Sequence, residues 1–328
     1  MKESLLRVEN LEVVYKAKEA SIKAVDDATI EVDKNECVAL IGESGSGKST
    51  IANAILRVLP ENARITGGQI SFKNNNLLDM KEEQMRKIRG KDISMVFQDP
   101  YSYLNPVLKI GDQLTETIRT HSPNFTREEA VEKTIELLSV MKIPDAPKIL
   151  NRYPYQLSGG MAQRVAISLA LCSNPSLVIA DEPTSSLDLT IQAQIIKLLK
   201  NLMDMFKISI LLITHDLSLV SNLATKVYVM QIGKIVEEDS VDGLYDNPTH
   251  PYSNMLLEAI KQLQGTSTSV NAINRDERSF ESSSGCKFAQ RCPLMKPVCL
   301  LKPPPYVSLT TGKKVLCWLH TEDAGDER

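Results

Sequence analysis

The sequence predicts an α/β fold, because short apolar runs typical of buried parallel strands are each followed by a polar segment. The run Cys37–Ile41 leads into a glycine-rich loop and then into helix-forming residues. The runs at residues 177–180 and 208–213 are equally apolar, as expected of strands buried on both faces. With 328 residues, the chain has room for two domains, or for one large domain with an appendage.

Other segments add to this α/β core. Residues 5–35 hold two β-type pieces, at 11–15 and 28–32, which predict a small antiparallel sheet. Further strands are expected at residues 70–72 and 93–97.

The pattern becomes helical between about residues 100 and 160. Thr126 and Glu129 form a capping box, and the apolar residues that follow recur at helical spacing. A second helix is expected from Ala162 to Cys172, at the start of a further α/β stretch.

Composition divides the chain into three parts. We expect a large domain over residues 1–262, whose helical subdomain spans about 100–160. The polar, serine-rich segment 263–285 is expected to be a linker. Residues 286–328 are proline-rich, carry four of the six cysteines, and are expected to form a small C-terminal extension.

Charge and hydropathy are ordinary. The net charge is −3, with 42 % hydrophobic and 24 % charged residues, so nothing global favours nucleic acid or an anionic membrane as a partner. The N-terminus lacks the apolar core of a secretory signal. No apolar run approaches the roughly 18 residues that span a bilayer. At a membrane, the chain would have to dock on the helices of other subunits.

The segment 42–50 fits the pattern G-x-x-x-x-G-K-[ST], which predicts a phosphate-binding loop. A bare glycine-rich turn is the alternative, but the strand before the loop and the helix after it favour a nucleoside triphosphate site. Backbone N–H groups and the helix N-terminus attract phosphate, Lys48 can reach the outer phosphates, and the Ser49 hydroxyl can ligate Mg²⁺. The predicted nucleotide-binding residues of this loop are Gly42, Glu43, Ser44, Gly45, Ser46, Gly47, Lys48, Ser49 and Thr50.

Two carboxylates, Asp181 and Glu182, follow the apolar strand at 177–180. A carboxylate at the end of a buried strand can hold Mg²⁺ opposite Ser49. Its neighbour can orient or deprotonate the attacking water as a general base. The alternative for Glu182, an ordinary surface residue at a strand end, is disfavoured by the phosphate loop earlier in the chain.

The segment 157–161, Leu-Ser-Gly-Gly-Met, opens the second helix with another anion-binding terminus. Here the sequence resembles the nucleotide-binding subunits of ABC transporters, whose LSGGQ signature differs only at Met161. The resemblance implies that Ser158, Gly159, Gly160 and Met161 complete the nucleotide site of a second subunit. It also implies that two ATP molecules are sandwiched in a dimer.

The same resemblance assigns roles to four more residues. Tyr15 matches the aromatic residue that stacks on adenine, although alone it would be an ordinary strand tyrosine. Gln98 matches the glutamine that touches Mg²⁺ and water and leads into the region contacting the membrane subunits. Asp188 matches the loop that crosses the dimer interface. His215 matches the histidine that contacts the γ-phosphate; a lone histidine at a strand end would more often be structural.

Two segments point to one branch of this family. The segment 247–253, Asn-Pro-Thr-His-Pro-Tyr-Ser, resembles the N-P-x-H-P-Y-[TS] segment of dipeptide, oligopeptide and nickel importer ATPases. The tetrapeptide 153–156 before the signature is also similar, with Tyr155 in place of the usual histidine. His250 is expected to be structural. The resemblance implies ATP hydrolysis that drives uptake of short peptides.

The implied partners are a second ATPase subunit, two transmembrane permease subunits and an extracytoplasmic substrate-binding protein. In this branch the two ATPases are often different proteins, so a heterodimer is expected, at the cytoplasmic face of the membrane. One alternative is import of nickel or another small solute. A soluble ABC ATPase acting on nucleic acid is disfavoured, because neither a second cassette nor a long coiled coil is visible. A metal-binding redox protein would leave the ATPase core unexplained.

Cys286, Cys292, Cys299 and Cys317 are separated by five, six and seventeen residues. Disulfides are disfavoured without signs of secretion, and the close pairs of most zinc sites and the common ferredoxin spacings are absent. The resemblance implies a 4Fe-4S cluster, which some peptide-importer ATPases hold in such a quartet. Zinc, with His320 as a substitute ligand, and unmetallated thiols remain alternatives. Cys37 and Cys172 lie in apolar runs and are expected in the core.

Overall fold

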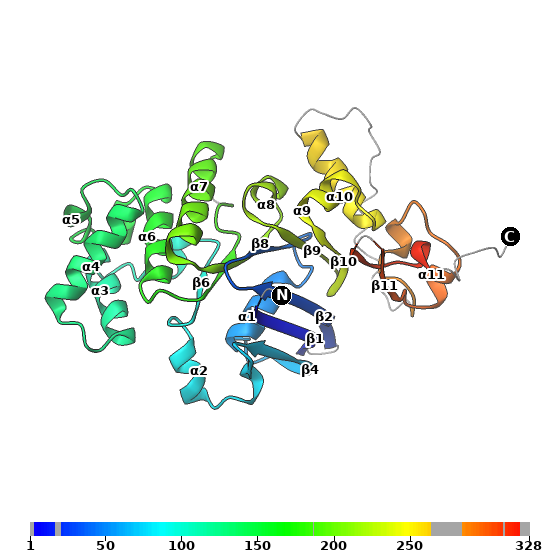
Figure 1. The fold of residues 1–328 in the computed structure, drawn as a ribbon, viewed down its shortest axis with the longest axis horizontal. Coiled ribbons are helices and arrows are strands. Elements are labelled where there is room, and N and C mark those ends of the chain that lie inside the picture. Colours follow the sequence, from blue (N-terminus) through cyan, green and yellow to red (C-terminus); the bar gives the residue numbers. More distant parts are fainter. Residues whose placement is uncertain (1–2, 17–20, 186, 264–283, 311, 322–328) are drawn as a thin grey trace.

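The structure is a computed structural model, described here for residues 3–16, 21–185, 187–263, 284–310 and 312–321. Nearly all of the linker expected at 263–285 lies outside these residues. Two sheets, a group of helices and the C-terminal extension make up the fold (Figure 1). No helix in the described ranges combines the length and the apolarity needed to cross a membrane.

The larger sheet has eight strands in the order β11-β12-β10-β9-β3-β8-β7-β6. Strands β9, β3, β8, β7 and β6 run parallel. The buried parallel strands predicted near residues 177–180 and 208–213 are therefore confirmed, and all residues of β3 and β8 are buried. The strands are β3 (Cys37–Ile41), β6 (Ile93–Val96), β7 (Leu177–Asp181), β8 (Ser209–Thr214), β9 (Lys226–Gln231), β10 (Lys234–Ser240), β11 (Tyr306–Ser308) and β12 (Lys314–Leu316).

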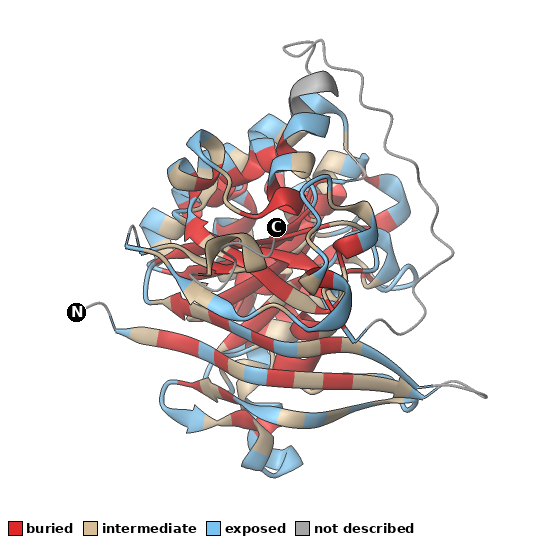
Figure 2. Cartoon of the chain, turned by 90° about the vertical axis from the view of Figure 1, so that its right-hand side faces the viewer, coloured by how far each residue is buried: buried red, intermediate tan, exposed pale blue. Residues whose placement is uncertain are grey.

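The smaller sheet is antiparallel, as predicted, in the order β2-β1-β4-β5. Its strands are β1 (Ser4–Lys16), β2 (Ser21–Asp33), β4 (Ala63–Phe72) and β5 (Asn75–Asn76). The pieces predicted from the sequence were too short, because β1 and β2 have 13 residues each. Charged side chains on the outer face interrupt the apolar pattern, but they pair across the strands. Buried and exposed residues alternate along these long strands (Figure 2).

Helices cover the sheets and form a separate group beside them (Figure 1). The predicted capping box is present: Thr126 N donates to Glu129 Oε2 at 2.7 Å, and Glu129 N donates to Thr126 Oγ1 at 3.2 Å. Helix α6 begins three residues before the predicted Ala162, because Ser158 caps it. The helical subdomain contains α3 (Ile110–His121), α4 (Arg127–Val140), α5 (Ala146–Ile149) and α6 (Gly159–Leu171).

The remaining helices flank the sheets or belong to the C-terminal region. They are α1 (Lys48–Leu56), α2 (Glu82–Ile88), α7 (Leu189–Phe206), α8 (Leu217–Leu223), α9 (Val241–Asp246), α10 (Pro251–Leu263) and α11 (Val298–Leu301). Short 3-10 turns are η1 (Leu77–Asp79), η2 (Pro100–Ser102), η3 (Pro154–Gln156), η4 (Ala289–Arg291) and η5 (Trp318–His320).

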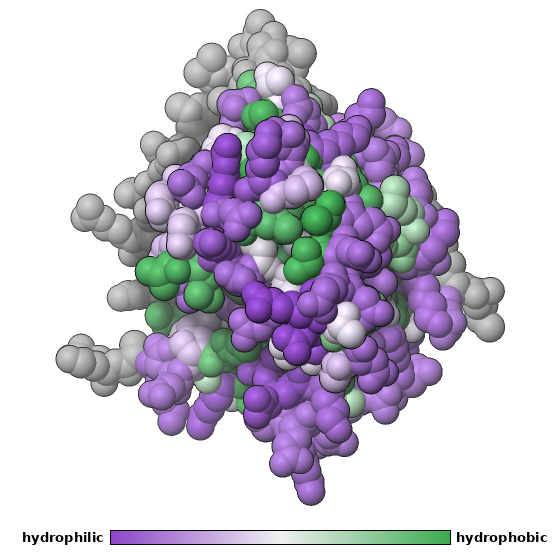
Figure 3. All heavy atoms as spheres, turned by 90° about the vertical axis from the view of Figure 1, so that its left-hand side faces the viewer, coloured by the Kyte–Doolittle hydropathy of each residue, from purple (hydrophilic) through white to green (hydrophobic). Residues whose placement is uncertain are grey.

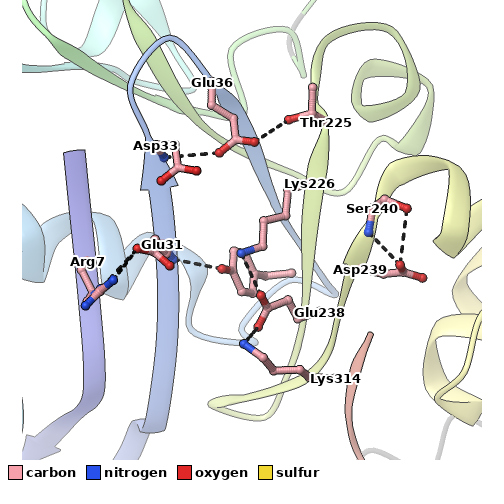
Figure 4. Close-up of polar contacts among 11 residues, drawn as sticks. Arg7, Glu31, Asp33, Glu36, Thr225, Lys226, Glu238, Asp239, Ser240 and Lys314 are labelled. Carbon is pink, nitrogen blue, oxygen red and sulfur yellow. Dashed lines mark hydrogen bonds and ion pairs between the residues drawn. The ribbon is translucent and has the colours of Figure 1, made fainter. Parts of the chain in front are cut away.

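The C-terminal extension is built onto the edge of the larger sheet. Strand β12 pairs antiparallel with β10, so that Glu238 lies opposite Lys314. The Glu238 carboxylate also pairs with Lys226 on β9 at 2.7 Å and with Lys314 at 2.9 Å, which joins three strands (Figure 4). A sequence pattern of short, proline-rich pieces gave no sign of this shared sheet.

Candidate nucleotide site and cysteine pocket

The loop between β3 and α1 is packed too tightly for side chains at two of its glycines. A Cβ on Gly42 would lie 2.1 Å from the carbonyl oxygen of Met230. A Cβ on Gly47 would lie 2.4 Å from the carbonyl oxygen of Ala24, and Gly47 has φ 109°. Glycine is therefore required at both positions, because the loop backbone lies against two neighbouring segments.

Lys48 is held inside this loop with only 6 % of its surface exposed. Its Nζ donates to the carbonyl oxygens of Gly42 and Glu43, both at 2.8 Å. Burial lowers the pKa of Lys48, and nearby carboxylates, chiefly those of Glu182 and Asp181, oppose that shift. The lysine charge is thus held within the loop, where the phosphates of a nucleotide would replace the carbonyl oxygens as its partners.

Ser49, at the start of α1, and Asp181, at the end of β7, are neighbours. Burial raises the pKa of Asp181, and a hydrogen bond with the Ser49 side chain opposes that rise. Mg²⁺ commonly takes one or two protein oxygens and fills its other positions with waters and phosphate oxygens. This pair fits such a site, although the described residues include no preformed group of three metal-ligating side chains.

Glu182 is held from two directions at the carboxyl edge of the sheet. Its backbone N–H donates to Ile213 O at 2.8 Å, and its Oε1 lies 3.0 Å from Nδ1 of His215. Glu182 has φ 47°, a left-handed conformation that is uncommon outside glycine. The structure therefore brings together Lys48, Ser49 and the predicted catalytic pair from three adjacent strand ends.

Tyr15, near the end of β1, also lies beside the loop. Its hydroxyl is 3.4 Å from Oγ1 of Thr50, and its ring is partly buried. The ring also packs against the core cluster that includes residues of both sheets.

The remaining predicted residues lie elsewhere on the surface. Gln98 follows β6 and is exposed. Ser158 caps α6 by accepting from Met161 N at 3.4 Å, and Asp188 caps α7 by accepting from Ile191 N at 3.0 Å. A Cβ on Gly160 would lie 2.9 Å from Cγ2 of Ile191, so the signature packs on the start of α7.

Two residues that contact the loop were missed as site residues. Tyr252 accepts from the backbone N–H of Glu43 through its hydroxyl at 2.9 Å. Arg291, in the C-terminal extension, pairs with the Glu43 carboxylate. Tyr252 lies in the segment 247–253, which identified only the branch of the family and did not predict a contact with the loop. For Arg291 the sequence offered no signal, because it is 248 residues from Glu43.

The four C-terminal cysteines line one small cavity, whose volume is about 10 Å³. Cys299 and Cys317 are each 8 % exposed. Burial raises the pKa of Cys317 to about 11, and it also raises the pKa values of Cys286 and Cys292. Other residues that line the cavity include His250, Phe288, Leu294 and Trp318.

The thiols share a cavity, although the described residues include no preformed group of three close metal-ligating side chains. His320 is absent from the lining, and its Nε2 lies 3.2 Å from Thr249 O. Cys37 and Cys172 are buried in the core, as predicted.

A phosphate loop, an acidic strand end and a helical subdomain with its own glycine-rich helix start define an ABC-type P-loop ATPase. Residues 25–185 match the ABC transporter family, and residues 236–299 match the family described as oligopeptide/dipeptide transporter, C-terminal region. The chain therefore belongs to the ATP-binding subunits of ABC transporters, in their oligopeptide/dipeptide branch. The resemblance stated from the sequence is confirmed, as is the predicted ATPase class.

Similar proteins cover nearly the whole chain. The oligopeptide transport ATP-binding protein AppD of Bacillus subtilis (strain 168) is 42 % identical over 326 residues, covering 99 % of each chain. The dipeptide transport ATP-binding protein DppD of Caldanaerobacter subterraneus is 40 % identical, covering 97 % of this chain and 98 % of its own. The dimeric cassette MJ0796, solved with ADP and Pi, superposes with a TM-score of 0.65 at 28 % identity, covering 72 % of this chain and 99 % of its own.

Proposed function

We propose that this ATPase drives import of dipeptides and oligopeptides through separate permease subunits. The observation that carries the catalytic part is the hydrogen-bonded pair of Glu182 and His215 beside the phosphate loop. The cargo is supported by the names of relatives that match over nearly the full chain.

In the nucleotide site, Lys48 and the loop N–H groups bind the phosphates, and Tyr15 contacts the base. Ser49, Asp181 and Gln98 would hold Mg²⁺, which would stabilise the negative charge on the transferred phosphoryl group. Glu182 is the general base for the attacking water. His215 orients Glu182 and contacts the γ-phosphate.

The exposed signature residues of this chain act on the nucleotide of a second subunit. Ser158, Gly159, Gly160 and Met161 form an exposed or half-exposed helix start that can accept a phosphate. Asp188, also exposed, faces the partner across the interface. Because each ATP then contacts both subunits, ATP binding closes the dimer and hydrolysis opens it. In this proposal the partner is a different ATPase subunit.

An apolar surface near Gln98 is the docking site for the permease. Figure 3 views the side of the helical subdomain, where apolar side chains gather among polar ones. Between β6 and the signature, the exposed apolar residues include Phe97, Tyr101, Val107, Leu108 and Tyr155. Docking there places the chain at the cytoplasmic face of the membrane, with a substrate-binding protein on the other side.

The cysteine pocket, in this proposal, holds a 4Fe-4S cluster. Four thiols that line one cavity supply the number of ligands that a 4Fe-4S cluster takes. Deprotonation of buried thiols is costly, and bound metal supplies the compensating charge. We also propose that the protein has three functional parts, which are the large domain, the linker and the cysteine-bearing extension.

Uptake by cells that carry only the Glu182→Gln form tests the cargo. We expect loss of labelled dipeptide and oligopeptide uptake, while nickel uptake continues. Selective loss of nickel uptake would replace the peptide assignment with the nickel alternative. Unchanged uptake of all three, with the variant shown to be inactive in vitro, would reject the proposed cargo.

A further inference from the structure

The C-terminal extension reaches the phosphate loop through a bidentate ion pair. Arg291 Nη1 lies 3.0 Å from Glu43 Oε2, and Nη2 lies 2.7 Å from Glu43 Oε1. The side chains are 26 % and 42 % exposed, so the pair is partly screened from water. Two parallel N–H···O bonds fix the direction of the carboxylate as well as neutralising its charge.

Glu43 is the second residue of the phosphate loop, so its charge matters to any anionic ligand. Its carbonyl oxygen accepts from Lys48 Nζ at 2.8 Å, and its carboxylate interacts electrostatically with the same ammonium. A carboxylate this close to the lysine that meets phosphates repels a triphosphate unless a cation neutralises it or its direction is fixed. Arg291 does both.

Packing within the C-terminal extension fixes the position of the Arg291 side chain. Phe288, three residues earlier, is 1 % exposed, and its ring lies 5.8 Å from the Arg291 guanidinium and 5.6 Å from the Tyr252 ring. Tyr252 in turn accepts from the backbone N–H of Glu43 at 2.9 Å. Both the side chain and the backbone of Glu43 are therefore fixed by one packed unit.

A second path connects the extension to the same loop. Lys287 donates to Ile232 O at 3.2 Å and pairs with Asp26 at 3.1 Å. The adjacent Gly233 N–H donates to Ser46 O at 2.8 Å. Through Lys287 the extension thus also contacts the segment that is hydrogen-bonded to the loop.

We propose that Arg291 is a positioning residue for the nucleotide site, which neutralises Glu43 and holds its carboxylate away from the triphosphate. The affinity of this chain for ATP then depends on its C-terminal extension. This inference concerns ATP binding alone and does not rest on the proposed cargo or on the cluster.

The test is a double-mutant cycle on the full-length chain, read out as the Kd of a fluorescent ATP analogue and, in the complex with the second ATPase subunit, as KM against kcat. We expect Arg291→Gln to raise Kd and KM about tenfold, which corresponds to about 1.4 kcal/mol, with kcat changed less than about twofold. Glu43→Gln removes the repelling charge, so the double variant should bind within about threefold of the original chain. Arg291→Lys should recover part of the affinity.

Arg7→Gln is the matched control, because Arg7 makes an equally short pair with Glu31 on the antiparallel sheet at 2.7 Å (Figure 4). Its Kd should not change. The loss in Arg291→Gln should also shrink at high salt, since it arises from charge. An unchanged Kd in Arg291→Gln would overturn the proposal. So would a double variant as weak as the single one, which would show that Arg291 acts through packing instead.

Discussion

Oε1 of Glu182 lies 3.0 Å from Nδ1 of His215, and the two residues follow adjacent parallel strands, β7 and β8. His215 is 60 % exposed, whereas Glu182 is 18 % exposed. The inner carboxylate is thus oriented by an outer imidazole, and the Glu182 backbone is in the left-handed region. A fixed orientation suits a general base, because the carboxylate must point toward the attacking water.

Glu182→Gln should retain ATP binding but lose hydrolysis. Because glutamine has a similar shape and cannot accept the water proton, we expect kcat to fall by at least about 100-fold. The ATP-loaded dimer should accumulate, which size-exclusion chromatography with the partner ATPase can detect. Phosphate release near the original rate would contradict the role given to Glu182.

His215→Ala should reduce kcat by about ten- to a hundredfold while changing the Kd for ATP much less, because the imidazole acts through Glu182 and the γ-phosphate. Single-turnover hydrolysis measures this separation. In the Glu182→Gln background the same substitution should cost little more, since residues that act as one unit are not additive. Full additivity would show that the pair does not act together.

The sequence was sufficient to predict which residues gather around the phosphate loop, because each signal is local. The phosphate loop, the carboxylates after β7 and the histidine after β8 each follow an apolar strand, and parallel strands bring their carboxyl ends to one edge. Strand lengths in β1 and β2 were underestimated, since their outer faces carry paired charges such as Arg7 and Glu31.

Contacts between distant segments could not be predicted from the sequence pattern. Arg291 and Glu43 are 248 residues apart, and the pairing of β12 with β10 joins two short strands without a periodic signal. The signature could be found from its residues as an anion-binding helix start, but its role and that of Asp188 at a subunit interface could be assigned only by resemblance, because within one chain both segments cap helices. Their chemical roles require a second subunit.

The cysteine pocket can be tested by metal content. Protein purified without oxygen should contain iron and inorganic sulfide and absorb visible light. Cys299→Ser should lower all three, because loss of one thiolate weakens the cluster. Cys172→Ala, a buried cysteine outside the pocket, is the control and should leave them unchanged. Colourless, iron-free protein would reject the cluster, and zinc in its place would favour the alternative.

Lys313 anchors the extension to the core through a buried pair. Its Nζ lies 2.7 Å from Asp239 Oδ2, and the side chains are 11 % and 6 % exposed. Lys313→Met would leave the Asp239 charge buried, so we expect the free energy of unfolding to fall by about 3–5 kcal/mol. Lys148→Met removes a pair that is 74 % and 69 % exposed, and it should cost less than about 1 kcal/mol. Chemical denaturation measures both.

Lys313→Met combined with Asp239→Asn should be more stable than Lys313→Met alone, because the uncompensated charge is then removed. If the double variant were no more stable, the loss would arise from the hydrogen bonds of Lys313 to the carbonyl oxygens of Gly243 and Asn247.

His250 should make the folded state sensitive to acid. It is 2 % exposed, and burial, assisted by His320, lowers its pKa from 6.5 to about 4. Its Nδ1 accepts from Tyr252 N at 3.0 Å, which requires an unprotonated nitrogen. Between pH 6.5 and about 4 the unfolded state therefore binds a proton that the folded state does not bind, and stability falls as the pH is lowered through this window.

Each pH unit in that window is worth at most about 1.4 kcal/mol from this one group. His250→Gln keeps an acceptor for Tyr252 N but cannot be protonated there, so unfolding free energies at pH 7 and pH 5 should differ less than in the original chain. Denaturant titrations at the two pH values give this comparison directly. An equal pH dependence in both proteins would show that the buried imidazole is not the group responsible. Carboxylates such as Asp26 would then be the source of acid sensitivity. The pKa of Asp26 is lowered, because its hydrogen bonds to Lys23 and Lys287 outweigh the effect of burial.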